Sequence, residues 1–83
     1  MSVYEIIKKH IDKLDYLGFL KMGAPNDEYD IESQLILETM QINPTEIGLQ
    51  KTICEVFSTM FNRKFEISDF SEIARNIYID LKT

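Results

Sequence analysis

The sequence is poor in the residues that adapt a small protein to secretion or to use as a linker. Its 83 residues include one cysteine, three glycines, two prolines and no tryptophan. A single cysteine cannot form an internal disulfide, so we expect a reducing cytoplasm. Low glycine and proline contents exclude collagen-like and linker-like chains. We expect a single domain, residues 1–83, because two cores made from so short a chain would each be too small.

Long uncharged runs are also missing. The longest cover seven residues each, at 39–45 and 56–62, whereas a membrane-spanning helix needs about 20 apolar residues. Six charged side chains within the first twenty residues argue against a signal peptide. The sequence therefore predicts a protein that neither crosses a membrane nor is exported.

Positive charge is absent from the middle of the chain. Residues 1–21, 22–50 and 51–83 carry formal charges of +1, −6 and 0, which together give the net charge of −5. Phosphate backbones and anionic lipids attract basic surfaces, so this charge disfavours nucleic acid and membranes as partners. A basic protein partner is favoured instead, because opposite charges steer association.

The apolar residues that are present recur with helical spacing. Capping residues mark the starts of four segments with this spacing: 3–14, 26 or 27 to about 41, 43 to about 61, and 68 or 69 onward. Ser2 and Glu5 form a predicted capping box at the first segment, and Asn43 is the predicted N-cap of the third, with Pro44 at the first helical position. The fold class predicted is all-α, a single compact four-helix bundle with a long apolar loop between the first two helices. In that loop, residues 15–26, we expect Leu17, Phe19 and Leu20 to pack on the bundle, since their burial is favourable.

The third helix carries the widest apolar face, so we expect it to be the most buried. Ile53, Phe57 and Met60 are predicted at its centre. Cys54 lies on the flank of this face, where a small buried side chain is a better interpretation than a nucleophile. The only histidine, His10, is expected to be a packed or boundary residue of the first helix.

Residues for catalysis or metal binding do not form a recognisable set. A zinc site needs about four ligands, and one histidine and one cysteine with scattered carboxylates do not supply them. Glu28 and Glu32 lie four apart on the apolar side of the second helix. Acid–base work is one interpretation of this pair, but structural pairing is favoured, with Glu32 meeting a base or His10 and Glu28 capping the loop. We expect no metal, no cofactor and no enzymatic activity.

The second helix is expected to carry the binding surface. Its predicted partner-binding residues are Asp27, Glu28, Asp30, Gln34 and Glu38. A helix that only contacts water usually mixes signs, because Glu–Lys pairs four apart stabilise it. This helix has no lysine or arginine at all, so an external cation is expected to offset its charge. The alternative is that the acidity serves only solubility and the helix dipole.

One stretch of the chain resembles a known family. Residues 15–30 read DYLGFLKMGAPNDEYD, and residues 53–65 and 73–75 add to the likeness. They resemble a family of short bacterial proteins described only as a domain of unknown function, number eighteen-seventy-one. The resemblance implies a small helical cytoplasmic domain with no established activity and no catalytic residues.

Two other acidic helical classes are comparable in size. Acyl carrier proteins need an Asp-Ser-Leu or Asp-Ser-Ile attachment motif, but Ser33 lies between Glu32 and Gln34, so this class is rejected. Colicin-type immunity proteins match in size, helix number and acidity, although their Tyr-Tyr-Pro motif is absent. The same mode of action is expected to be open to this chain, because an acidic helix can neutralise a basic toxin by charge-steered binding.

The function expected is therefore that of a non-enzymatic protein-binding domain. Its sharpest form is an immunity or antitoxin-like inhibitor that neutralises a basic toxin, for example a nuclease. The alternative is a housekeeping regulatory or adaptor protein of the uncharacterised bacterial family. We expect a cytoplasmic monomer or weak homodimer.

Overall fold

Four α-helices and one short 3₁₀ helix account for the regular structure. The computed structural model describes residues 2–15, 18, 21–23, 29–40 and 44–83. The elements in chain order are α1 (Val3–Leu14), α2 (Asp30–Thr39), α3 (Glu46–Met60), η1 (Ile67–Phe70) and α4 (Ser71–Lys82). No strand occurs in these described residues, and the predicted all-α class with four packed helices is confirmed.

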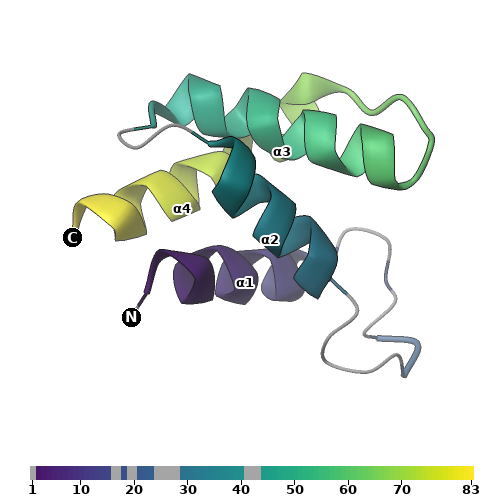
Figure 1. Ribbon diagram of the computed structural model, residues 1–83, viewed down its shortest axis with the longest axis horizontal. Coiled ribbons are helices and arrows are strands. Elements are labelled where there is room, and N and C mark those ends of the chain that lie inside the picture. Colours follow the sequence, from purple (N-terminus) through teal and green to yellow (C-terminus); the bar gives the residue numbers. More distant parts are fainter. Residues whose placement is uncertain (1, 16–17, 19–20, 24–28, 41–43) are drawn as a thin grey trace.

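The helices pack in a closed cycle (Figure 1). α1 lies against α2, α2 against α3, α3 against α4, and α4 returns to α1. The 3₁₀ helix η1 packs on both α3 and α4. The N-terminal end of α1 and the C-terminal end of α4 lie on the same side of the molecule. This arrangement leaves one face of α2 and the junction between α1 and α4 on the outside.

The first helix has the limits that the sequence predicts. Ser2 Oγ accepts from the Glu5 backbone N–H at 3.1 Å, and Glu5 Oε1 accepts from the Ser2 N–H at 3.1 Å. The predicted capping box is therefore present. The hydrogen bond from the Ser2 backbone stabilises the carboxylate and lowers the pKa of Glu5.

The second helix starts later than predicted. α2 begins at Asp30, and Tyr29 forms its N-cap with φ −106° and ψ 15°, outside the helical region. The Tyr29 ring is buried against Phe57 and its hydroxyl is held by Asp15. These contacts between distant parts of the chain fix where the helix begins, and a sequence pattern does not reveal them. Residues 26–28 and 41–43 lie outside the described part. Leu17, Phe19 and Leu20 do so too, and their packing on the bundle stays a prediction.

The third helix is capped by a different residue from the one predicted. Thr45, not Asn43, is the N-cap, and its hydroxyl accepts from the Gly48 N–H at 2.9 Å. Pro44 therefore lies before the cap rather than at the first helical position. Asn and Thr are both favourable N-cap residues, so residue type alone does not decide between them.

The fourth helix also starts later than the predicted residue 68 or 69. η1 occupies that position, and α4 begins at Ser71. The tight turn brings the Phe65 and Phe70 rings together, with centroids 6.1 Å apart, and sets Phe70 5.4 Å from Phe57. The residues just before α4 are therefore held in the 3₁₀ turn by aromatic packing, and α4 begins after them. Glu66, the residue before η1, has an extended backbone, with φ −81° and ψ 137°.

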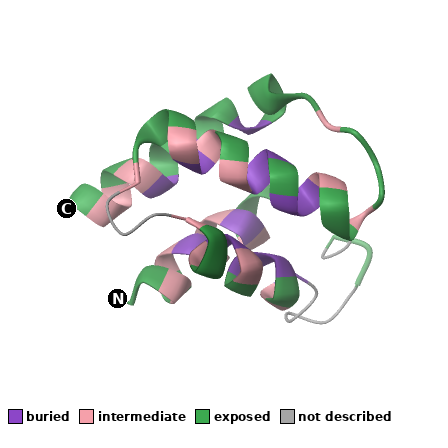
Figure 2. Ribbon diagram, turned by 45° about the horizontal axis from the view of Figure 1, so that its top comes forward, coloured by how far each residue is buried: buried purple, intermediate pink, exposed green. Residues whose placement is uncertain are grey.

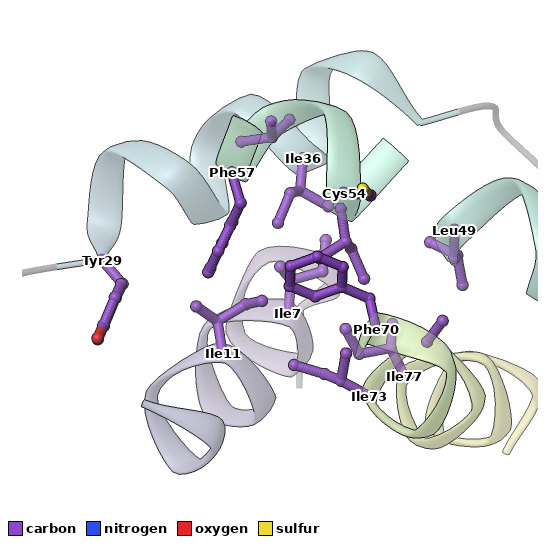
Figure 3. Close-up of a cluster of buried hydrophobic side chains, with 13 residues drawn as sticks. Ile7, Ile11, Tyr29, Ile36, Leu49, Cys54, Phe57, Phe70, Ile73 and Ile77 are labelled. Atoms are coloured by element: carbon purple, nitrogen blue, oxygen red, sulfur yellow. The ribbon is translucent and has the colours of Figure 1, made fainter. Parts of the chain in front are cut away.

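The four helices share one hydrophobic core, with the buried residues turned inward (Figure 2). Its members are Ile7, Ile11, Tyr29, Ile36, Leu49, Ile53, Cys54, Val56, Phe57, Phe70, Ile73, Ala74 and Ile77. Phe57 links the aromatic residues of this core. Its ring stacks on Tyr29 at 6.3 Å and meets Phe61 edge-on at 5.8 Å. Figure 3 shows side chains from α1, α3 and α4 converging around Phe57 and Phe70.

The prediction for the centre of α3 is partly wrong. Ile53 and Phe57 are fully buried, and α3 contributes more buried residues than any other described helix. Met60, however, is 37 % exposed. It is the last residue of α3, and there Phe61 packs against Phe57 instead.

Candidate functional site

Two of the predicted partner-binding residues lie side by side on the outer face of α2. Gln34 and Glu38 are both exposed, and Gln34 Nε2 donates to Glu38 Oε2 at 3.0 Å. Their spacing of four places them on one face of the helix. Ile31, also exposed, lies one turn before Gln34. We call Ile31, Gln34 and Glu38 the α2 face.

Asp30, a third predicted residue, is engaged within the protein. Its Oδ1 accepts from Lys8 Nζ at 2.6 Å, and the same ammonium group pairs with Asp12 at 2.8 Å. The hydrogen bonds to Asp12 and then to Asp30 hold the pKa of Lys8 above its usual range. Lys8 therefore links α1 to α2. It balances the charge of Asp30 from within the protein, whereas the sequence predicts an external cation for this helix.

The other two predicted residues, Asp27 and Glu28, lie outside the described part of the chain. Glu32 belongs to the buried side of α2, as its position on the apolar face predicts. The predicted Glu28–Glu32 pair therefore stays a prediction. The α2 face that the structure does describe is smaller than the predicted surface.

Asp15 anchors the residues that precede α2 through hydrogen bonds. The sequence does not predict this role. It caps the end of α1 in the left-handed region, with φ 44°, and only 7 % of it is exposed. Its carboxylate accepts from the Tyr29 hydroxyl at 2.7 Å and from the Lys21 N–H at 3.1 Å. It thus joins the end of α1 to the start of α2. Asp tolerates the left-handed region better than most residues, which is the one sequence signal for this role.

A second charged cluster joins α1 to α4. Asp80 Oδ2 lies 2.6 Å from His10 Nε2 and 3.0 Å from Lys9 Nζ. The hydrogen bonds from His10 and then Lys9 stabilise the carboxylate and lower the pKa of Asp80. His10 is partly buried, as its predicted boundary position requires. Its partner is Asp80, so of the two partners predicted for Glu32, a base or His10, the histidine is engaged elsewhere.

An open groove of about 520 Å³ lies beside this cluster, between α1 and α4. α1 contributes Lys13 and Leu14 from its last turn, while α4 contributes Glu72, Asn76 and Ile79. Ile79 is half exposed and borders the groove opposite the last turn of α1, a placement that no local sequence pattern indicates.

Cys54 is buried in the core, as predicted. Its Sγ lies 3.3 Å from the Phe65 carbonyl oxygen, in the geometry of a hydrogen-bond donor. Among the described residues no three histidine, cysteine or acidic side chains gather as a metal site. The described helices also include none with the length and apolar character needed to cross a membrane.

Comparisons of this chain with protein-family models, with curated proteins and with solved structures gave no match.

Proposed function

We propose that this chain is a non-enzymatic protein-binding domain whose α2 face meets a basic protein partner. In its sharpest form it is an inhibitor of the immunity or antitoxin type, which covers the basic surface of a toxin such as a nuclease. We propose that it works in the cytoplasm, without a cofactor, as a monomer or weak homodimer.

The observation that carries this proposal is the segregation of charge. Residues 22–50 hold six acidic residues and no lysine or arginine, and this segment alone accounts for the acidity of the chain. An acidic segment of this kind attracts a cationic partner and raises its association rate, by about 10-fold to 1,000-fold in well-steered complexes.

The contacts on α2 indicate which residues are suited to this role. The charge of Asp30 is already balanced by Lys8. Glu38 is exposed, and its described partner is the uncharged Gln34. A carboxylate offers about four lone-pair sites, so Glu38 can accept from an external lysine or arginine while it holds Gln34. Glu38 is therefore the residue to test first.

The experiment compares one charge reversal on this face with a matched reversal elsewhere. The tagged chain, Glu38→Lys and Glu55→Lys are each expressed in the cell of origin, and bound proteins are identified by mass spectrometry. Glu55 is an exposed acid of α3, outside the α2 face. We avoid Asp30→Lys, because it would bring a second ammonium group beside Lys8.

We expect a basic protein that the original chain and Glu55→Lys retain and that Glu38→Lys binds more slowly. With purified proteins at low salt, the association rate should fall by about tenfold, and the difference should shrink as salt is added. Equal association rates for the two variants would contradict the role of the α2 face. Co-expression then separates inhibition from simple binding, since an inhibitor must relieve the toxicity of its partner.

A housekeeping regulatory or adaptor role is the second candidate, favoured by the resemblance to the uncharacterised bacterial family. No family model matches the chain, so membership in that family stays a prediction. A partner that is harmless when expressed without this chain would favour the adaptor. A partner that kills the cell unless the chain is present would favour the inhibitor.

A further inference from the structure

The groove between α1 and α4 presents apolar surface from both helices. Ile73 lies at its base and is buried, whereas Leu14 and Ile79 are 39 % and 50 % exposed. Single exposed apolar residues are normal on a protein surface. Here two of them, from different helices, border the same hollow, so a ligand in the groove would bury both at once.

The charges around this groove are unequally distributed. Asp69 and Glu72 lie at the end formed by η1 and the first turn of α4, and both are exposed. Asp80 is also acidic, but Lys9 and His10 already contact it. The part of the chain that the structure describes contains no ion pair to Glu72. Lys13, from the last turn of α1, lies at the same end of the groove, because α1 and α4 run in opposite directions. The groove therefore joins apolar walls to an end that holds two carboxylates and one ammonium group.

We propose that this groove is a docking site for a short cationic amphipathic helix of a partner protein. A helix laid between two others places an apolar stripe in the hollow and its polar side chains along the rim, which is a common mode of peptide recognition. Apolar side chains of the partner would cover Leu14 and Ile79, while lysine or arginine would meet Glu72. The carboxylates Asp69 and Glu72 outnumber the ammonium group of Lys13 at this end, which is why we commit to a cationic helix rather than an acidic one.

Neither binding surface requires the other. The α2 face lies on α2 alone, whereas the groove is formed by α1, η1 and α4. Glu38 and Glu72 can therefore be changed separately, and each variant reports on one surface. Glu55→Lys serves as the control for both, because it makes the same charge change on α3.

The probe is a synthetic amphipathic peptide of leucine and lysine, patterned so that leucine recurs at helical spacing. It is titrated into isotope-labelled protein, and amide shifts are followed by NMR. We expect saturable shifts at Leu14, Asn76 and Ile79. The dissociation constant should rise by about fivefold to tenfold in Glu72→Lys, since reversal replaces attraction by repulsion at a rim position. Glu55→Lys should bind like the original chain.

Four control measurements complete the test. Ile79→Ser should weaken binding of the leucine–lysine peptide, and circular dichroism confirms that each variant is folded. A serine–lysine peptide of equal charge should bind more weakly, because it lacks the apolar stripe. A leucine–glutamate peptide should not bind.

Several results would overturn the assignment. These are an absence of saturable binding, equal weakening by Glu72→Lys and Glu55→Lys, or a serine–lysine peptide that binds as tightly. Shifts confined to Gln34 and Glu38 would assign the cationic segment to the α2 face instead. Concentration-dependent shifts at Ile79 without peptide would show that a second copy of the chain covers the groove.

Discussion

Replacing Phe57 by alanine tests the description of the core most severely. Phe57 is fully buried, and its ring contacts Tyr29, Phe61 and Phe70 at centroid distances of 6.3, 5.8 and 5.4 Å. Truncation of a buried phenylalanine costs about 3–5 kcal/mol, because transfer and cavity terms add. A chain of 83 residues is expected to have a free energy of unfolding of about 4–12 kcal/mol. Phe57→Ala should therefore remove a large part of the stability.

Urea unfolding followed by circular dichroism measures this loss. Phe57→Leu provides a milder step if the alanine variant does not fold, with an expected cost of about 1 kcal/mol and a melting temperature lower by about 4–8 °C.

Met60→Ala is the matched control, on the same helix. Since Met60 is 37 % exposed, its truncation should cost less than about 1 kcal/mol. Equal losses for Phe57→Ala and Met60→Ala would refute the assignment of burial along α3. The sequence pattern alone predicts such equality, because it places both residues at the centre of the core.

Two further predictions concern hydrogen bonds between distant parts of the chain. Tyr29→Phe should lower the free energy of unfolding by about 1.5–3 kcal/mol, because it removes a buried donor to the carboxylate of Asp15; an unchanged urea midpoint would show that this contact does not hold the start of α2. Asp80→Asn should lower the melting temperature at neutral pH, because the hydrogen bonds from His10 and Lys9 depress the pKa of Asp80 in the folded state. That stabilisation is present above the ordinary carboxyl pKa of 3.8 and is lost as the pH falls through the folded value, so thermal melts of the two proteins should converge in strong acid.

The sequence predicts those parts of the fold that depend on local chemistry. The capping box at Ser2 and Glu5 and the apolar spacing that follows it define α1 to the residue. The predicted starts of α2 and α4 are wrong, because the observed starts depend on contacts between residues that are distant in the sequence. Tyr29 is fixed by Asp15 and Phe57. Phe70 is fixed by its packing against Phe57, which lies on another helix.

The candidate site shows the same division between local and distant effects. The spacing of Gln34 and Glu38 correctly places them on one exposed face of α2. The pairing of Asp30 with Lys8 could not be read from the sequence, because 22 residues separate them along the chain. The groove between α1 and α4 arises only when these helices pack, so no local pattern indicates it.

The charges of this protein therefore divide into two groups with different uses. Asp30 and Asp80 face lysine or histidine side chains of α1 and hold the helices together. Glu38 and Glu72 are exposed on two separate surfaces, and neither takes part in an ion pair within the described residues. Net charge alone does not distinguish the two groups. Charge reversal at Asp30 or Asp80 should lower the stability of the fold. Charge reversal at Glu38 or Glu72 should leave folding intact and weaken association with a partner. The two kinds of variant therefore distinguish the residues that hold the helices together from those that bind a partner.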